Sequence, residues 1–206
     1  MVGIGIERVF RTRGQIAVLR ALWKAPTSLT GRQVQHLAGV HNRTAMQSLE
    51  DLAQLGVVQC RSAGRANLYA LKRSHWIVRD LIEPAFKAEQ LAPDRLKREL
   101  ADAVESHCIS AILYGSVARG QAGPSSDIDL LVVVRNKRAA ESFAEKAQSE
   151  AEHAVRDGWG AMLEVNVKTI ADLRRQWDTR LMKRIRREGL LVAGRPLAEV
   201  RRGRSS

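Results

Sequence analysis

The sequence is short of several features that would place it in a specialised class. Two cysteines in 206 residues, Cys60 and Cys108, are too few for a disulfide framework or a cysteine-rich metal site. Both stand among apolar neighbours, so we expect them in the core. No apolar run approaches the roughly 18 residues of a membrane-spanning helix, and the first residues lack the apolar run of a secretory signal. These absences predict a cytoplasmic protein with no membrane partner.

What the chain has in excess is positive charge. It carries 34 Lys and Arg against 22 Asp and Glu, a formal net charge of +12. Residues 1–79 alone hold twelve basic and three acidic side chains, a net charge of +9. A balance of this kind favours polyanionic partners, nucleic acid above all. A chain of this length also has room for two small domains.

The first part of the chain predicts a small helical domain with one hairpin. From hydrophobic spacing and turn residues we expect three helices, over residues 15–25, 31–39 and 41–55. Two short strands are expected over residues 57–61 and 68–71. Thr30 and Gln33 have the spacing of a capping box, and residues 62–67 form the expected hairpin loop. This order of helix, helix–turn–helix and two-stranded wing resembles the winged helix-turn-helix DNA-binding domains, over residues 1–79.

The third of these helices is the expected DNA-recognition helix. Its apolar stripe of Ala45, Leu49 and Leu52 predicts an inner face. The outer face then carries polar residues, of types that suit contacts with base edges and phosphates. The candidate DNA contacts are Arg43, Thr44, Gln47 and Ser48, with Arg65 at the hairpin tip for the minor groove. The resemblance implies double-stranded DNA as a partner and a homodimer. The alternative is a winged helix used only for dimerisation or docking.

A second pattern lies between residues 109 and 134. Two apolar runs of strand length flank ten residues rich in Gly, Pro and Ser, and the second run is preceded by Asp127-Ile-Asp129. Side chains alternate along a strand, so Asp127 and Asp129 share one face and lie roughly 7 Å apart. Two such carboxylates need a cation between them, and Mg²⁺ that carries nucleotide phosphates is the usual one.

The turn before this loop supplies residue types that suit a phosphate. Gly115 allows close approach of the backbone, Ser116 follows it, and Arg119 stands one turn further on. The spacing of Gly-Ser, ten residues and Asp-x-Asp resembles the polymerase-β-type nucleotidyltransferases, in particular their small minimal branch. The resemblance implies a polymerase-β-like domain, two Mg²⁺ ions, and transfer of a nucleoside monophosphate from a nucleoside triphosphate, expected to be ATP.

The resemblance also calls for a third carboxylate on a neighbouring strand. Residues 161–168 alternate polar and apolar, which predicts that strand, and Glu164 is the best match, with Asn166 at the next candidate position. The family usually has Asp there, so Glu is a departure. We therefore predict Asp127, Asp129 and Glu164 as catalytic and metal-binding residues. The alternative for Glu164 is a surface ion pair with Lys168.

The fold class expected for the whole chain is α+β. Residues 80–107 form a helical linker, and a helix that starts at Pro93 begins the nucleotidyltransferase domain of residues 108–206, so that 93–107 is its first helix. Further helices are expected over residues 136–157 and 171–187.

Two functions fit these motifs. The first is a metal-dependent nucleotidyltransferase with a DNA-binding domain, antitoxin-like and able to repress its own operon, whose acceptor is a protein or an RNA. The second is a transcription regulator whose nucleotidyltransferase domain binds nucleotide or a partner without catalysis.

Overall fold

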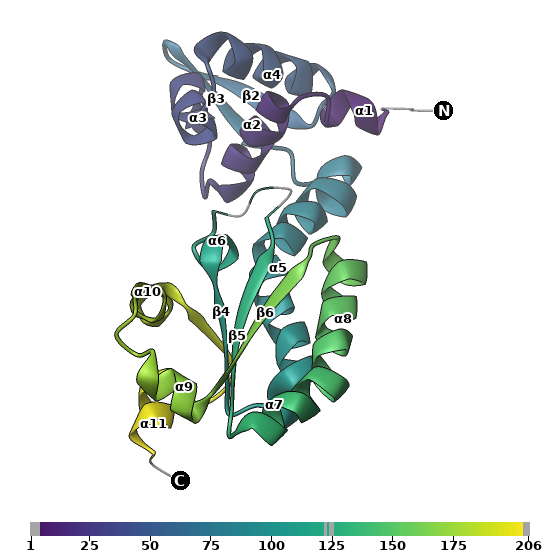
Figure 1. The fold of residues 1–206 in the computed structure, drawn as a ribbon. Coiled ribbons are helices and arrows are strands. Elements are labelled where there is room, and N and C mark those ends of the chain that lie inside the picture. Colours follow the sequence, from purple (N-terminus) through teal and green to yellow (C-terminus); the bar gives the residue numbers. More distant parts are fainter. Residues whose placement is uncertain (1–4, 122, 124–125, 204–206) are drawn as a thin grey trace. The chain divides into compact units, whose positions relative to one another are not determined.

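The computed structural model describes residues 5–121, 123 and 126–203 of the chain. The chain divides into two compact units, Met1–Leu91 and Ala92–Ser206. The boundary falls inside one helix, α5 (Glu83–Val104), which begins in the first unit and ends in the second (Figure 1).

The N-terminal unit consists of short helices and a three-stranded antiparallel sheet. Its elements are α1 (Ile6–Val9), α2 (Arg13–Lys24), β1 (Leu29–Thr30), α3 (Gly31–Ala38), α4 (Asn42–Gln54), β2 (Val58–Ala63), β3 (Ala66–Leu71) and a π-helical turn (Val78–Ile82). The sheet order is β1-β3-β2, with β3 central. Thr30 and Gln33 form the predicted capping box at the start of α3. The short strand β1 was not predicted, because two residues leave no alternating pattern.

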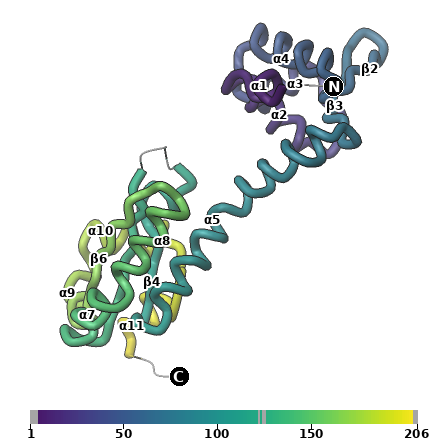
Figure 2. The backbone as a smooth tube through the Cα atoms, turned by 90° about the vertical axis from the view of Figure 1, so that its right-hand side faces the viewer, coloured from purple at the N-terminus to yellow at the C-terminus, as the bar shows by residue number. Residues whose placement is uncertain are grey.

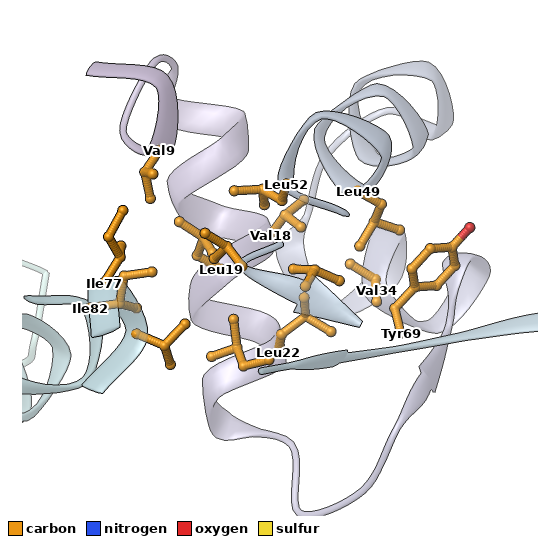
Figure 3. Packing of buried hydrophobic residues seen from close by; sticks show 14 of the residues in the cluster. Val9, Val18, Leu19, Leu22, Val34, Leu49, Leu52, Tyr69, Ile77 and Ile82 are labelled. Carbon is orange, nitrogen blue, oxygen red and sulfur yellow. The ribbon is translucent and has the colours of Figure 1, made fainter. Parts of the chain in front are cut away.

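The core of this unit follows the helical spacing of its apolar residues. Val18, Leu19 and Leu22 of α2 point toward Leu49 and Leu52 of α4, as Figure 3 shows. All five side chains are buried. Residues three or four positions apart lie on one face of a helix, so each helix presents a continuous apolar stripe to the other.

The hairpin between β2 and β3 is tighter than the sequence suggested. The two strands pair in register from Val58 with Leu71 out to Ala63 with Ala66, which leaves only Gly64 and Arg65 in the turn. The expected six-residue loop is therefore wrong. A two-residue turn with Gly first has the twist that paired strands need, and this pairing extends both strands beyond their apolar parts.

Cys60 is exposed, so its predicted place in the core is wrong. It lies on β2, an edge strand in which only Val58 is buried and exposure rises toward the hairpin. Cys108 is partly buried.

Helix α5 runs without a break through Pro93, as Figure 2 shows. The predicted helix start at Pro93 is therefore wrong, since the helix begins at Glu83. A proline inside a helix removes one backbone hydrogen bond. Buried Phe86 on one side of Pro93 and buried Leu96 and Leu100 on the other anchor both halves. Neither α5 nor any other helix in the described ranges is long and apolar enough to cross a membrane.

The C-terminal unit is a mixed sheet flanked by helices. After α5 its elements are β4 (Ser110–Tyr114), α6 (Gly115–Ala118), β5 (Ile128–Val134), α7 (Lys137–Phe143), α8 (Ser149–Trp159), β6 (Leu163–Thr169), α9 (Ile170–Arg175), α10 (Arg180–Glu188), β7 (Leu190–Gly194) and α11 (Leu197–Arg202). The sheet order is β6-β5-β4-β7. Strands β5 and β6 are parallel, and β4 is antiparallel to both β5 and β7.

Helices cover both faces of this sheet (Figure 1), and each face has its own apolar core. On one face, Leu130 and Val132 pack with residues of α5, α7 and α8. On the other, Leu131 and Val133 pack with residues of α9, α10 and α11. Alternation along β5 sends these residues to opposite sides, which is why the strand reads as a continuous apolar run.

Two helices that the sequence predicted as continuous are interrupted. A π-helical turn (Ala144–Gln148) separates α7 from α8, and residues 176–179 separate α9 from α10. The second break coincides with a cap, because the Thr179 side chain accepts a hydrogen bond from the Met182 amide at the start of α10. Strand β7 and helix α11 were not predicted.

Candidate active site

Three neighbouring strand ends bring polar side chains into one row. Tyr114 at the end of β4 is the register partner of Asp129 on β5, and Asp129 is the parallel partner of Glu164 on β6. Register partners on adjacent strands project to the same face, about 5 Å apart. The row lies on the face that α9, α10 and α11 cover, at the end where β4 stops.

Gly115 closes one side of this row. Its backbone has φ +76°, a left-handed conformation that side chains rarely adopt. A Cβ placed there would lie 1.9 Å from Oδ2 of Asp129, so only glycine fits against this carboxylate. Asp127 comes directly before β5 and is exposed, while Asp129 is half-buried.

The carboxylates at this end of the sheet interact unfavourably. Burial raises the pKa of Asp129, and the nearby charges of Glu164 and Asp127 raise it further, whereas Arg184 and Arg119 act in the opposite direction. Within the described part of the chain, Asp127, Asp129 and Glu164 have no ion pair within 4 Å. The site thus holds negative charge that a bound cation would compensate.

These acids fit a metal only in part. No group of three or more His, Cys, Asp or Glu side chains among the described residues is arranged to hold a metal ion. Mg²⁺ binds through one or two carboxylates and completes its shell with water and substrate phosphates. The pair of Asp127 and Asp129 therefore suits an ion that arrives with a triphosphate, while Glu164 is not gathered into a three-acid group.

Tyr114 is a site neighbour that no motif of the chain singles out. The side chain of Asn166, the position where a second acid was considered, acts on its hydroxyl and lowers the pKa of Tyr114. Burial raises the pKa of Tyr114, and the charge of Asp129 raises it further. The tyrosine thus stays protonated and can donate a hydrogen bond at this end of the sheet.

Arg119, expected to meet a phosphate, has partners within the protein. Its Nε donates to Oε1 of Gln121 at 3.0 Å, and its Nη1 lies 3.5 Å from Oε2 of Glu188 at the end of α10. Ser116 follows Gly115 in α6 and is half-buried. The ion pair between Arg119 and Glu188 joins the glycine turn to α10.

The basic helix α10 is a second feature that sequence reasoning left unassigned. Its residue Arg184 lies near enough to lower the pKa of Asp129. Helix α10 contacts both α6 and β4. Local sequence could reveal the positive charge but not which strand end it would meet.

The candidate DNA-binding residues lie in the N-terminal unit. Arg43, Thr44 and Gln47 are exposed on α4, and Arg65 is exposed in the two-residue turn. Ser48 is only 5 % exposed, so its predicted outward position is wrong. It lies three residues after Ala45, on the buried stripe of the helix.

Comparison with known proteins defines the class of the C-terminal unit. Residues 94–192 match the family model of the nucleotidyltransferase domain. That match supports a nucleotidyltransferase domain in this unit, and the mixed sheet flanked by helices agrees with it. Domains of this family generally use a divalent metal ion and a nucleoside triphosphate.

The other comparisons add no functional argument. No curated protein matches the chain. Among solved structures, the chain is similar to human N-acetylserotonin methyltransferase in complex with SAM, at 15 % identity and a TM-score of 0.32. That similarity covers 75 % of this chain and 42 % of the methyltransferase, so the chain spans less than half of that protein.

The contact between Gly115 and Asp129 can be tested with two alanine variants. Gly120 also has a positive φ, +66°, but a Cβ there meets no described atom within 4 Å. We expect Gly120→Ala to cost about 1–2 kcal/mol from backbone strain alone. Gly115→Ala should cost more and should also weaken ATP binding. Urea unfolding and calorimetric titration measure both effects, and equal losses in the two variants would show that the close contact is unimportant.

The charge coupling predicts a specific change in proton affinity. We expect Glu164→Gln to lower the pKa of the Asp129 carboxyl, because the substitution removes a neighbouring negative charge. Glu141→Gln, an exposed change on α7, should leave that pKa unaltered. Carbon-13 NMR titration of the Asp129 carboxyl measures it, and identical titration curves for both variants would contradict the coupling.

The raised pKa of Asp129 also has a consequence for the stability of the fold. Because the folded-state pKa of Asp129 lies above its ordinary value, its ionised form opposes folding at pH 7. This penalty disappears as the pH falls through the folded pKa. Asp129→Asn should therefore raise the free energy of unfolding at pH 7, with a difference that shrinks on acidification.

Proposed function

We propose that the C-terminal unit transfers a nucleoside monophosphate from a nucleoside triphosphate, expected to be ATP, to an acceptor. The observation that carries the proposal is the row of Asp129 and Glu164 beside Gly115, within the segment that matches the nucleotidyltransferase family. An acidic row with uncompensated charge beside a glycine turn suits a metal-bound triphosphate.

The proposed roles follow from position. Asp127 and Asp129 would hold Mg²⁺, with Glu164 as the third ligand. Two such ions, when bound, stabilise the attacking and leaving oxygens of an in-line displacement. The carboxylate of Glu164, exposed at the sheet edge, can also accept the proton of the acceptor hydroxyl.

The triphosphate would lie against the turn from Gly115 to Arg119. Gly115 leaves its backbone open to the ligand, and Ser116 offers a hydroxyl there. Arg119 holds Glu188 in the free protein, so phosphate binding requires it to exchange that carboxylate for a phosphate oxygen. Guanidinium groups pair with both anions through the same hydrogen-bonding fork.

The N-terminal unit is proposed to be a winged helix-turn-helix that binds double-stranded DNA as a homodimer. Support comes from α3 and α4 in sequence, the hairpin of β2 and β3, and exposed Arg43, Thr44 and Gln47 on α4. Together with transfer to a partner protein or an RNA, DNA binding would make the chain an antitoxin-like enzyme that represses its own operon.

A second candidate is a regulator whose nucleotidyltransferase domain binds nucleotide or a partner without turnover. One observation favours it, since no three-acid group able to hold a metal forms among the described residues. Glu164 in place of the Asp usual in the family points the same way.

Label transfer separates the two candidates. With Mg²⁺ and each α-labelled nucleoside triphosphate in turn, the wild-type chain should label an acceptor in a mixture of co-purified protein and RNA. Asp127→Asn with Asp129→Asn should reduce the rate by at least about a hundredfold, since both groups would hold the ions that stabilise the charge of the transition state. Glu141→Gln with Glu150→Gln, two exposed acids on α7 and α8, is the matched control. Wild-type chain that binds triphosphate and labels nothing would favour the regulator.

DNA recognition by α4 predicts unequal effects of three substitutions. Against a duplex selected from a random library, Arg43→Ala should weaken specific binding by about 1–3 kcal/mol if the side chain contacts a base. Ser48→Ala should have no effect on contacts, because Ser48 is buried. Lys24→Ala removes the same charge from the exposed end of α2 and serves as the control. Equal affinity for Arg43→Ala and wild type, measured by fluorescence anisotropy, would reject α4 as the recognition helix.

A further inference from the structure

Helix α10 has one buried face and one strongly basic face. Met182 and Ile185 are buried in the core beneath the sheet. The outward residues include Arg180, Lys183, Arg184 and Arg187, all of them exposed. From Arg180 to Arg187 the row extends about 10 Å along the helix axis.

Most of this positive charge is not neutralised by the protein. In the ranges that the structure describes, Arg180, Lys183 and Arg184 form no ion pair within 4 Å. Arg187 pairs with Glu188, the same carboxylate that Arg119 contacts. Three adjacent cations without a carboxylate partner repel one another, so an anionic ligand would relieve an existing cost.

The same residues line a surface hollow. Its volume is about 890 Å³, and its lining is Arg180, Leu181, Lys183, Arg184 and Arg187. Four of these five residues are cationic. A protein partner would need an apolar centre to its interface, for which Leu181 alone is insufficient. Interfaces with nucleic acid are more polar and much more positive, which agrees with this lining.

The hollow is connected to the candidate active site. The ion pair between Glu188 and Arg119 joins the end of α10 to the glycine turn, and the charge of Arg184 acts on Asp129. Arg180 lies one helical turn beyond Arg184, about 6 Å further along the axis. The basic residues of α10 thus lead away from the acids, and a triphosphate bound at the glycine turn would leave Arg180 uncovered.

We propose that the basic face of α10 binds the phosphate backbone of a single-stranded nucleic acid whose end is the acceptor for nucleotidyl transfer. The acceptor role rests on the proposed function, whereas the binding surface does not. A strand presents phosphates at regular intervals, so consecutive phosphates can occupy the hollow while the terminal hydroxyl lies near Asp127 and Asp129. A phosphate row of this kind is read without regard to base sequence.

Salt dependence tests the binding surface directly. The probe is a fluorescein-labelled 20-nucleotide RNA, titrated with the full chain in EDTA without nucleotide, and followed by anisotropy at several salt concentrations. Arg180→Ala with Lys183→Ala should lower the slope of log K against log salt concentration by about 1.4, because each phosphate contact contributes about 0.7 for a single strand. If the affinities of variant and wild type for the RNA converge at about 1 M salt, the variant should bind about 25-fold more weakly at about 0.1 M salt.

The control removes equal charge from the opposite face of the sheet. Arg98→Ala with Arg156→Ala changes exposed residues of α5 and α8, helices that pack on the other core. We expect this pair to leave the slope unchanged, whereas a loss of similar size in both pairs would indicate only net-charge attraction and would overturn the proposal. An unchanged slope for Arg180→Ala with Lys183→Ala would also overturn it, since both residues are exposed and the fold is not at risk.

Competition and label transfer separate the remaining ligands. If ATP or polyglutamate displaces the RNA from wild type as well as unlabelled RNA does, the hollow is a triphosphate site or an acidic-protein site, and the proposal fails. Label transfer to the RNA, with a lower kcat/KM for RNA and an unchanged KM for triphosphate in the α10 variant, supports the acceptor role. RNA binding that depends on α10 without any label transfer would retain the surface and reject the proposed function instead.

Discussion

The close approach of Gly115 to the carboxylate of Asp129 is the constraint on which the rest of the C-terminal unit depends. It requires a residue without a side chain where β4 ends, and its left-handed backbone directs the chain into α6. It also fixes how far β4 can extend alongside β5. Tyr114, Asp129 and Glu164 fall into one row because β4 pairs with β5 through Tyr114 and Asp129, and β5 pairs with β6 through Asp129 and Glu164.

This arrangement concentrates like charges and balances them only at a distance. The acids lie at the strand ends, and the cations that act on Asp129 are Arg184 of α10 and Arg119, which directly follows α6. Stability would improve if the acids were neutral, so their presence fits a site shaped by ligand binding rather than by folding. Opposite charges on separate elements leave room between them for a ligand that carries both metal and phosphate.

The parts of this structure that could be predicted are those with a local cause. The strands around Gly115 were evident because apolar runs, turn residues and alternating acids lie within one short stretch. Ser48 was misplaced because a position beside a helical stripe can face either way until the packing partner is known. The continuity of α5 through Pro93 depends on buried leucines on both sides, and the meeting of Arg184 with Asp129 depends on chain topology. Neither leaves a signal in the neighbouring sequence.

Strand β6 is at the edge of its sheet and, among the strands that the structure describes, pairs with β5 alone. Side chains on a strand alternate between faces, so a shift of β6 by a single residue would turn Glu164 away from the acids and bring an apolar neighbour in its place. The backbone hydrogen bonding of a parallel pair is nearly the same after such a shift. The same shift would take Leu163, Val165 and Val167 out of the apolar core that they share with α5, α7 and α8. Burial of these three side chains, rather than hydrogen bonding, therefore keeps the third acid in line.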